Sequence, residues 1–272
     1  MHSILLSIGP FTLKSYGLLM AMGFAAAWCA ATRLGRGTPR NADYVANLSV
    51  WLMLAGIAGA RLAYVAEHWT AEFAGHPGRI VRIDQGGVMF YGGVAGAALA
   101  LLLFVRRRRE RLFEVSDLML AVLPLGHAFG RIGCFLHGCC HGRVWQGPLA
   151  VVFPAGSPAW IVQCDAGQIL PTATHGLPVL PTQLFEAAAN LALFVVLFVL
   201  YRRLRGRSGV VTAVYFLAYP AIRYAIEPLR GDERMSIGPW SIGQAVSLAL
   251  FAVGAALLVW RLRATARPEP RG

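Results

Sequence analysis

The chain has 272 residues, of which 57% are hydrophobic and 14% charged, with a formal net charge of +12. A soluble domain carries about 25% charged residues, so this composition excludes an ordinary soluble protein and indicates a membrane protein with several spans. The positive charge does not indicate a nucleic-acid partner, because such binding needs a contiguous cationic surface and the arginines here fall in short clusters between apolar runs.

Seven apolar segments approach the roughly 20 residues that are needed to cross a bilayer. They cover about 13–31, 44–66, 86–105, 115–133, 183–200, 209–227 and 241–260. The segments predict an all-α bundle of about seven transmembrane helices, forming a single integral-membrane domain over residues 1–272. The stretch from Met1 to Pro10 lacks the basic region of a cleavable signal peptide, so the first segment is expected to remain as a span.

Clusters of arginine follow the first, third, fifth and seventh segments. Their members are Arg33, Arg36 and Arg40; Arg106, Arg107, Arg108, Arg109 and Arg111; Arg202, Arg203, Arg205 and Arg207; and Arg261, Arg263, Arg267 and Arg271. The positive-inside rule makes these connectors cytoplasmic, with the N-terminus outside and the C-terminus inside. The long connector 134–182, rich in Pro and Gly, is then external, and we expect it to form a small cap.

The densest group of reactive side chains lies where the fourth segment ends. Residues 126–143 contain three His, three Cys, two Arg and five Gly. Ionisable groups at a membrane edge are candidates for function. They are also compatible with a metal site, because Cys134-x-x-His137 has ligand spacing, although the consecutive donors 139–141 fit one tetrahedral ion poorly.

The cysteines leave a structural alternative open. Cys134, Cys139, Cys140 and Cys164 are all expected on the external, oxidising side, and four cysteines permit three pairings. Adjacent Cys139 and Cys140 rarely bond to each other, so the structural alternative is a bridge from one of them to Cys134 or Cys164.

Polar side chains recur at the predicted external ends of the spans. They are Tyr16, Arg61, Tyr91, Arg131, Glu186, Arg223, Glu227 and Arg230. Thr182 is expected to cap the fifth span, and Arg223 and Glu227 share one helical face that Arg230 continues. Cations at one depth suit an anionic headgroup, and arginine holds phosphate through two parallel hydrogen bonds. The residues alone predict an external site for a phospholipid or another phosphate-bearing amphiphile.

A purely structural role is also possible for Tyr16, for Arg61 and for the Gly-Gly pairs of the third segment. Tyr16 could belong to the aromatic belt of the membrane interface, and Arg61 could snorkel to the outer headgroups. The Gly-Gly pairs at the start of the third span could serve helix packing through small residues.

Six motifs follow one another from the first predicted span to the sixth. They are Tyr16-Gly17; Gly59-Ala60-Arg61; Gly86-Gly87 with Phe90-Tyr91-Gly92-Gly93; Gly130-Arg131-Ile132-Gly133-Cys134-Phe135 with Gly142; Pro181-Thr182-Gln183-Leu184-Phe185-Glu186; and Arg223 to Glu227. In this order and combination they resemble the prolipoprotein diacylglyceryl transferases of bacterial inner membranes. The resemblance covers most of the chain and implies seven spans with the N-terminus outside, in agreement with the charge pattern.

The resemblance implies transfer of the sn-1,2-diacylglyceryl group from phosphatidylglycerol to the lipobox cysteine thiol of a preprolipoprotein. It implies no metal or cofactor; the expected partners are these substrates and membrane lipids, and we expect a monomer in the bacterial inner membrane. The alternatives are a membrane metal or redox protein that uses the Cys and His cluster, and a non-catalytic relative that binds lipid.

The resemblance also implies roles for single residues. Arg131 and Arg223 would grip the phosphate, Glu227 would orient Arg223, and Tyr16 would help to line the headgroup pocket. The further substrate-binding positions are Arg61, Gly92, Gly93, Gly130, Gly133, Gly142, Gln183, Glu186 and Arg230.

Four positions depart from the family pattern. Cys134 and His137 stand where better-known members have Asn, Cys139 where they have Glu, and Tyr91 where they have a His. The base that activates the thiol is therefore a substituted group. Imidazole titrates nearer neutrality than phenol, so we expect His137 to be the base, with Tyr91 as a further catalytic group. His127 is equally compatible with a structural role in the fourth span.

Overall fold

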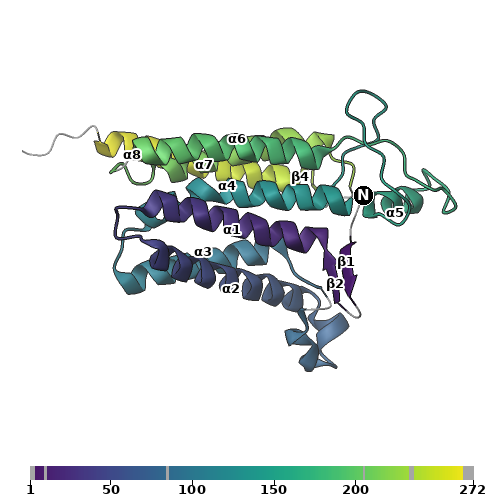
Figure 1. The fold of residues 1–272 in the computed structure, drawn as a ribbon, viewed down its shortest axis with the longest axis horizontal. Helices are drawn as coiled ribbons and strands as arrows, with labels where there is room; N and C mark the ends of the chain where they lie inside the picture. Colours follow the sequence, from purple (N-terminus) through teal and green to yellow (C-terminus); the bar gives the residue numbers. More distant parts are fainter. Residues whose placement is uncertain (1–3, 9–10, 84–85, 205, 233–235, 266–272) are drawn as a thin grey trace, which may run out of the picture. The chain divides into compact units, whose positions relative to one another are not determined.

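The structure is a computed structural model that describes residues 4–8, 11–83, 86–204, 206–232 and 236–265. These residues form a helical protein with two small antiparallel hairpins, β1 (Ile4–Ile8) with β2 (Phe11–Lys14) and β3 (Ser236–Ile237) with β4 (Trp240–Ser241) (Figure 1). The chain divides into two compact units, a smaller one of residues 31–116 and a larger one of residues 1–30 and 117–272.

Six helices in the described part of the chain are long and apolar enough to cross a membrane. They are α1 (Ser15–Gly35), α2 (Ala42–Glu67), α3 (Phe90–Arg108), α4 (Leu112–His137), α6 (Thr182–Arg203) and α8 (Ile242–Thr265). They match six of the seven predicted segments. The remaining segment, 209–227, forms α7 (Val210–Ile226), a shorter helix of 17 residues.

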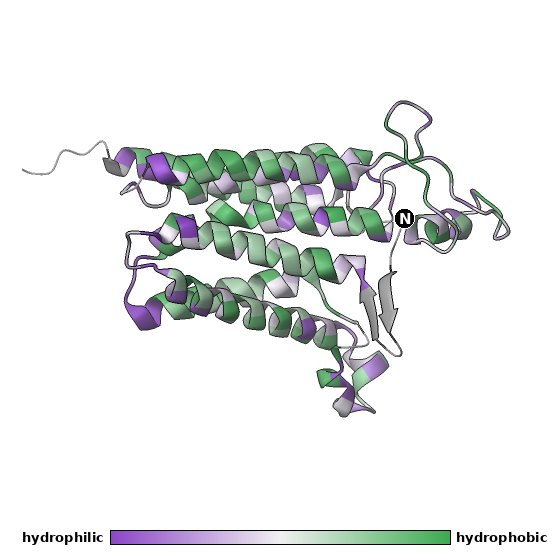
Figure 2. Cartoon of the chain, viewed as in Figure 1, coloured by the Kyte–Doolittle hydropathy of each residue, from purple (hydrophilic) through white to green (hydrophobic). Residues whose placement is uncertain are grey.

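The outer faces of these helices are apolar. Large hydrophobic side chains stay exposed on the helices, such as Leu62 at 62% and Val195 at 58%. Figure 2 shows hydrophobic residues along most of each long helix, with polar ones gathered near the ends. Exposed apolar surface on this scale marks contact with a membrane or another apolar partner, which agrees with the composition.

In the smaller unit, α2 packs along α3 through glycines. A Cβ added to Gly92 would lie 2.5 Å from the carbonyl oxygen of Gly59, so a larger residue would separate the helices. Gly93 faces Gly56 across the same contact. Gly92 and Gly93 therefore serve helix packing, the structural alternative considered from the sequence, because small residues let two helices approach closely.

In the larger unit, α7 packs against α6 and α8. Buried Asp117 on α4 fixes the start of α7, because its carboxylate accepts hydrogen bonds from the backbone N–H groups of Gly209 (2.6 Å) and Thr212 (2.7 Å). The first half of α1 approaches α4 at Gly133, where an added Cβ would lie 3.1 Å from the ring of Tyr16. Small residues on α4 thus let α1 pack closely.

The connector between α4 and α6 forms a small body of its own. It contains α5 (Pro158–Asp165), extends beyond the ends of α4 and α6 (Figure 1), and has a core of Phe153, Ala159 and Val179. It begins later than the predicted residue 134, because α4 continues to His137. Gly138 then ends the helix with a φ of 87°, the left-handed conformation typical of a helix C-terminus.

Candidate active site

Five polar side chains meet near one end of the helices in the larger unit. His127 and Arg131 come from the last turns of α4, Glu186 from the first turns of α6, and Arg223 from the last turn of α7. Glu227 begins the short helix η4 (Glu227–Leu229) directly after α7. We call these five residues the arginine–glutamate cluster.

Glu186 is the centre of the cluster and is only 1% exposed. Its Oε1 accepts a hydrogen bond of 2.8 Å from Arg131 Nη2 and lies 3.5 Å from His127 Nε2. Its Oε2 lies 4.0 Å from Arg223 Nη1. A buried carboxylate needs compensating partners, and Glu186 has two cations beside it.

The second carboxylate of the cluster holds Arg223. Glu227 Oε2 forms an ion pair of 2.7 Å with Arg223 Nη2, and Glu227 Oε1 accepts a hydrogen bond of 2.6 Å from Ser241 Oγ. Ser241 and Gln244 form a capping box at the start of α8, with both reciprocal hydrogen bonds at 3.1 Å. The beginning of α8 therefore fixes Glu227, and Glu227 fixes Arg223.

Two buried guanidinium nitrogens of the cluster have no hydrogen-bond partner among the described residues. They are Arg131 Nε and Arg223 Nη1. Buried polar groups are nearly always hydrogen-bonded, so a pair of unsatisfied donors in one cluster is unusual. Charge-assisted donors of this kind suit an anionic acceptor such as a phosphate.

Two histidines of residues 126–143 occupy different places. His127, whose role the sequence left open, belongs to the cluster, and its signal was the spacing of four residues that puts it on one face with Arg131. His137 is exposed at the end of α4, with its ring centroid 6.5 Å from that of Tyr16. Tyr16 itself is 40% exposed.

The sequence pattern did not lead us to predict Ser241 as a site residue, although Ser-x-x-Gln before an apolar run is a capping signal.

Gly142 lies between two other backbone segments. Its N–H donates to the carbonyl of Leu180 at 2.8 Å, and it pairs with Arg230 in an antiparallel bridge. An added Cβ would lie 2.6 Å from the Leu180 oxygen, so only glycine fits. Arg230 forms a bidentate pair with Asp232 at 2.9 and 2.6 Å, so its guanidinium is engaged there and does not extend the Arg223–Glu227 pairing.

The start of α6 is hydrogen-bonded to the loop that follows α4. Thr182 Oγ1 donates to the carbonyl of Cys140 at 3.0 Å, and Gln183 Nε2 donates to that of Cys139 at 2.7 Å. The predicted cap by Thr182 is therefore wrong: Pro181 occupies the N-cap position, because the threonine hydroxyl binds a distant carbonyl. Both side chains position the loop that follows α4.

All five cysteines are free thiols in the structure, so none of the bridges considered from the sequence is formed. The Sγ atoms of Cys134, Cys139 and Cys140 lie within 4.8 Å of one another. Hydrogen bonds from the thiols of Cys134 and Cys139, together with nearby arginines, hold the pKa of Cys140 below the usual range of a thiol.

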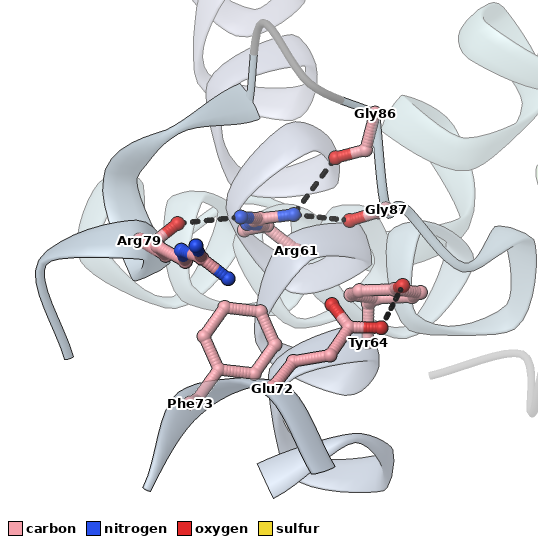
Figure 3. A pocket seen from close by; sticks show the side chains of 7 residues that line it. All are labelled: Arg61, Tyr64, Glu72, Phe73, Arg79, Gly86 and Gly87. Atoms are coloured by element: carbon pink, nitrogen blue, oxygen red, sulfur yellow. Dashed lines mark hydrogen bonds between the residues drawn. The ribbon is translucent and has the colours of Figure 1, made fainter. Parts of the chain in front are cut away.

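Arg61 belongs to the smaller unit and is 7% exposed. Its guanidinium donates hydrogen bonds of 2.7 to 3.2 Å to five backbone carbonyls, those of Arg79, Ile80, Arg82, Gly86 and Gly87. Figure 3 shows the bonds to Arg79, Gly86 and Gly87. A guanidinium has five N–H donors, so none is left for a substrate. Arg61 therefore neither snorkels nor offers a donor for phosphate; it organises the segment between α2 and α3.

The remaining predicted residue of the smaller unit is Tyr91. It lies in the first turn of α3, is 50% exposed, and contacts the ring of Phe90 at a centroid distance of 5.6 Å.

The fold and the site together define a helical membrane protein with a buried cluster of arginines and carboxylates near one end of its helices. The chain belongs to the prolipoprotein diacylglyceryl transferase family, whose family model matches residues 3–260. Phosphatidylglycerol–prolipoprotein diacylglyceryl transferases of three bacteria are similar to it. That of Nostoc sp. is 35% identical over 98% of this chain and 91% of its own length. That of Pseudoalteromonas translucida is 33% identical over 99% and 96%, and that of Shigella boydii 30% over 96% and 93%.

Family membership makes the chain a transferase of lipoprotein biosynthesis and a multi-pass protein of the bacterial inner membrane. The predicted family, enzyme class and location are confirmed.

Proposed function

We propose that the chain transfers the diacylglyceryl group of phosphatidylglycerol to the lipobox cysteine of a prolipoprotein, and that Arg131 and Arg223 hold the phosphate. The relatives over nearly the whole chain carry this activity in their names. The observation that carries the assignment of the arginines is the pair of unsatisfied buried donors, Arg131 Nε and Arg223 Nη1. A phosphodiester supplies the anionic oxygens that these donors lack.

The reaction places specific demands on this cluster. The thiolate of the substrate cysteine attacks the glyceryl carbon, so a C–S bond forms and the bond from that carbon to the phosphate oxygen breaks. The electron pair leaves with glycerol phosphate, whose charge the two guanidiniums stabilise. Glu186 holds Arg131 and Glu227 holds Arg223. The guanidinium donors are therefore already oriented toward the phosphate position before the substrate binds.

The base that accepts the thiol proton is His137 in this proposal. Its imidazole is exposed at the end of α4, beside Tyr16, where a peptide thiol arriving from the aqueous side has access. Tyr16 lines the headgroup pocket. A comparison of His137→Ala with Tyr91→Phe separates the two groups: the proposal expects transfer to fail in the histidine variant, whereas failure confined to the tyrosine variant would make Tyr91 the base.

The proposal includes seven spans with the N-terminus outside. The seventh is α7 extended by η4, since residues 210–229 together have the roughly 20 residues that a span requires. The arginine clusters after α1, α3, α6 and α8 would then be cytoplasmic. The arginine–glutamate cluster, near the opposite ends, would face the outer leaflet.

Complementation tests the activity and the arginines together. In cells depleted of their own diacylglyceryl transferase, the chain should restore lipoprotein maturation, and Arg131→Ala or Arg223→Ala should abolish it. Arg203→Ala is the matched control, because Arg203 is an exposed arginine in the last turn of α6. Quantifying each variant in isolated membranes excludes failed insertion. Normal maturation in either cluster variant would refute the phosphate grip, and failure of the parent chain despite insertion would refute the activity.

A further inference from the structure

Three thiols converge directly after the arginine–glutamate cluster. The Sγ atoms of Cys134, Cys139 and Cys140 lie within 4.8 Å of one another, and all three thiols are unoxidised. Cys134 is 9% exposed and the other two are partly buried. Transfer of a diacylglyceryl group from one substrate to the thiol of another does not require three cysteines of the enzyme at one point, so the proposed reaction leaves this cluster unexplained.

The backbone brings the three thiols together through the turn that ends α4. The N–H groups of Gly138 and Cys139 both donate to the carbonyl of Cys134, at 2.9 and 3.2 Å. The chain therefore folds back over the last turns of the helix. Cys140 has a φ of 59°, a conformation that costs a residue other than glycine about 1 kcal/mol or more and persists only where the surroundings enforce it.

Two buried side chains of α6 enforce this conformation. Gln183 donates to the carbonyl of Cys139 at 2.7 Å, and Thr182 donates to that of Cys140 at 3.0 Å. Both side chains belong to residues that are 1% exposed. The two loop cysteines are thus fixed from α6 while Cys134 is fixed on α4, which is the rigid support that a metal-ligand set needs.

The charges around the thiols favour an anionic complex. Arg131 and Arg230 both interact electrostatically with Cys140, and Arg131 also with Cys134. Three thiolates and one divalent cation carry a single net negative charge. Neighbouring guanidiniums stabilise such a complex, and the carboxylates of Glu186 and Asp232, which pair with Arg131 and Arg230, offset part of this effect.

We propose that Cys134, Cys139 and Cys140 form a binding site for a thiophilic divalent cation of the zinc type. Zinc–sulfur bonds of about 2.3 Å place the sulfurs of a tetrahedral site about 3.8 Å apart, which the observed spacing allows with small side-chain rotations. Thiolate ligands select such ions over magnesium or calcium. Three protein ligands leave the fourth position for water or an incoming thiol.

The sequence argued against a metal site because consecutive donors fit one tetrahedral ion poorly, and the positions of the three thiols answer this argument. Three consecutive donors at 139–141 fit one tetrahedral ion poorly, but the third thiol comes from Cys134 on the helix, and the group does not depend on His141. The spacing of five residues between Cys134 and Cys139 is bridged by the helix-ending turn.

Metal binding to the purified full-length chain tests the proposal. The protein in detergent is reduced and the reductant is removed. One sample is then loaded with zinc and a separate sample with cobalt. We expect one zinc ion per chain by mass spectrometry and, with cobalt, the charge-transfer absorption of a cobalt–thiolate bond. Cys139→Ser should lower the affinity for zinc at least about tenfold. Replacing a residue that only hydrogen-bonds to a metal ligand already causes a loss of this size. Cys164→Ser, a cysteine outside the group, is the matched control.

A second measurement on the unaltered chain guards against a variant that fails to fold. Zinc should slow the alkylation of three of the five thiols, identified by peptide mass as Cys134, Cys139 and Cys140. Unchanged alkylation with zinc, or equal zinc affinity in the parent and Cys139→Ser chains, would overturn the proposal. Neither readout uses lipid transfer, so failure of the metal site and failure of the transferase assignment are distinguishable.

Discussion

Replacing Glu227 by Gln is expected to slow diacylglyceryl transfer by loosening Arg223 without disturbing the fold. Gln has the shape of Glu, and its amide oxygen can still accept the hydrogen bond from Ser241 Oγ that Glu227 Oε1 accepts at 2.6 Å. The substitution removes the negative charge that pairs with Arg223 Nη2 at 2.7 Å, and it places the amide NH2, a donor, where Glu227 Oε2 accepts.

The size of the effect follows from the burial of this pair. The side chains of Arg223 and Glu227 are 17% and 4% exposed, so water screens their interaction little. A hydrogen bond to a charged group contributes about 2 kcal/mol net. If Arg223 needs this contact to hold the phosphate in the transition state, a loss of about 2 kcal/mol lowers kcat/KM about 30-fold, at 1.36 kcal/mol for each factor of ten.

The assay is transfer from phosphatidylglycerol in proteoliposomes to a fluorescent peptide that carries a lipobox cysteine. Glu114→Gln is the matched control, because Glu114 pairs with Arg40 at the same distance of 2.7 Å in the smaller unit. Its side chain is 34% exposed, and ion pairs near the surface contribute about 0 to 1 kcal/mol. The control should therefore stay within a few-fold of the parent rate.

Two outcomes show whether Glu227 positions Arg223. A Glu227→Gln protein that transfers lipid as fast as the Glu114→Gln control would show that Glu227 does not position Arg223. A variant that is slow and also poorly inserted in the membrane would point to a folding defect, so the amount of inserted protein is measured in the same preparations.

Two further substitutions test packing. Arg61→Ala leaves five backbone carbonyls without their donor and should destabilise the smaller unit by about 3 kcal/mol or more, seen as a lower Tm; Arg79→Ala, at an exposed arginine, should not. Equal melting of both variants would contradict a supporting role of Arg61. Gly142→Ala puts a Cβ 2.6 Å from the Leu180 oxygen and should cost about 1 to 3 kcal/mol, whereas Gly75→Ala, with open space around it, should be silent in the same melting assay.

The sequence by itself determined the class of the protein and the positions of six helices that are long and apolar enough to cross a membrane. Hydropathy is summed along the chain, so six of the seven predicted segments coincide with helices long enough to cross a membrane. It also placed Arg131, Glu186, Arg223 and Glu227 at the ends of their helices, because a charge is tolerated there and not at the centre of a span. The spacing of four residues between Arg223 and Glu227 predicted their ion pair correctly.

Only the tertiary structure decided which of these groups meet. Arg61 and Arg230 look alike in the sequence, as arginines near the ends of spans. Arg61 donates to five backbone carbonyls and Arg230 forms a bidentate pair with Asp232, whereas Arg131 and Arg223 each keep a buried nitrogen without a hydrogen-bond partner among the described residues. Likewise, the sequence offered Cys134 with His137 as possible metal ligands and the donors 139–141 beside them, but the turn after α4 brings Cys134 together with Cys139 and Cys140 instead. The pairing of Arg131 with Glu186 depends on a contact between segments that are 55 residues apart in the chain, and the local pattern of residue types carries no information about it.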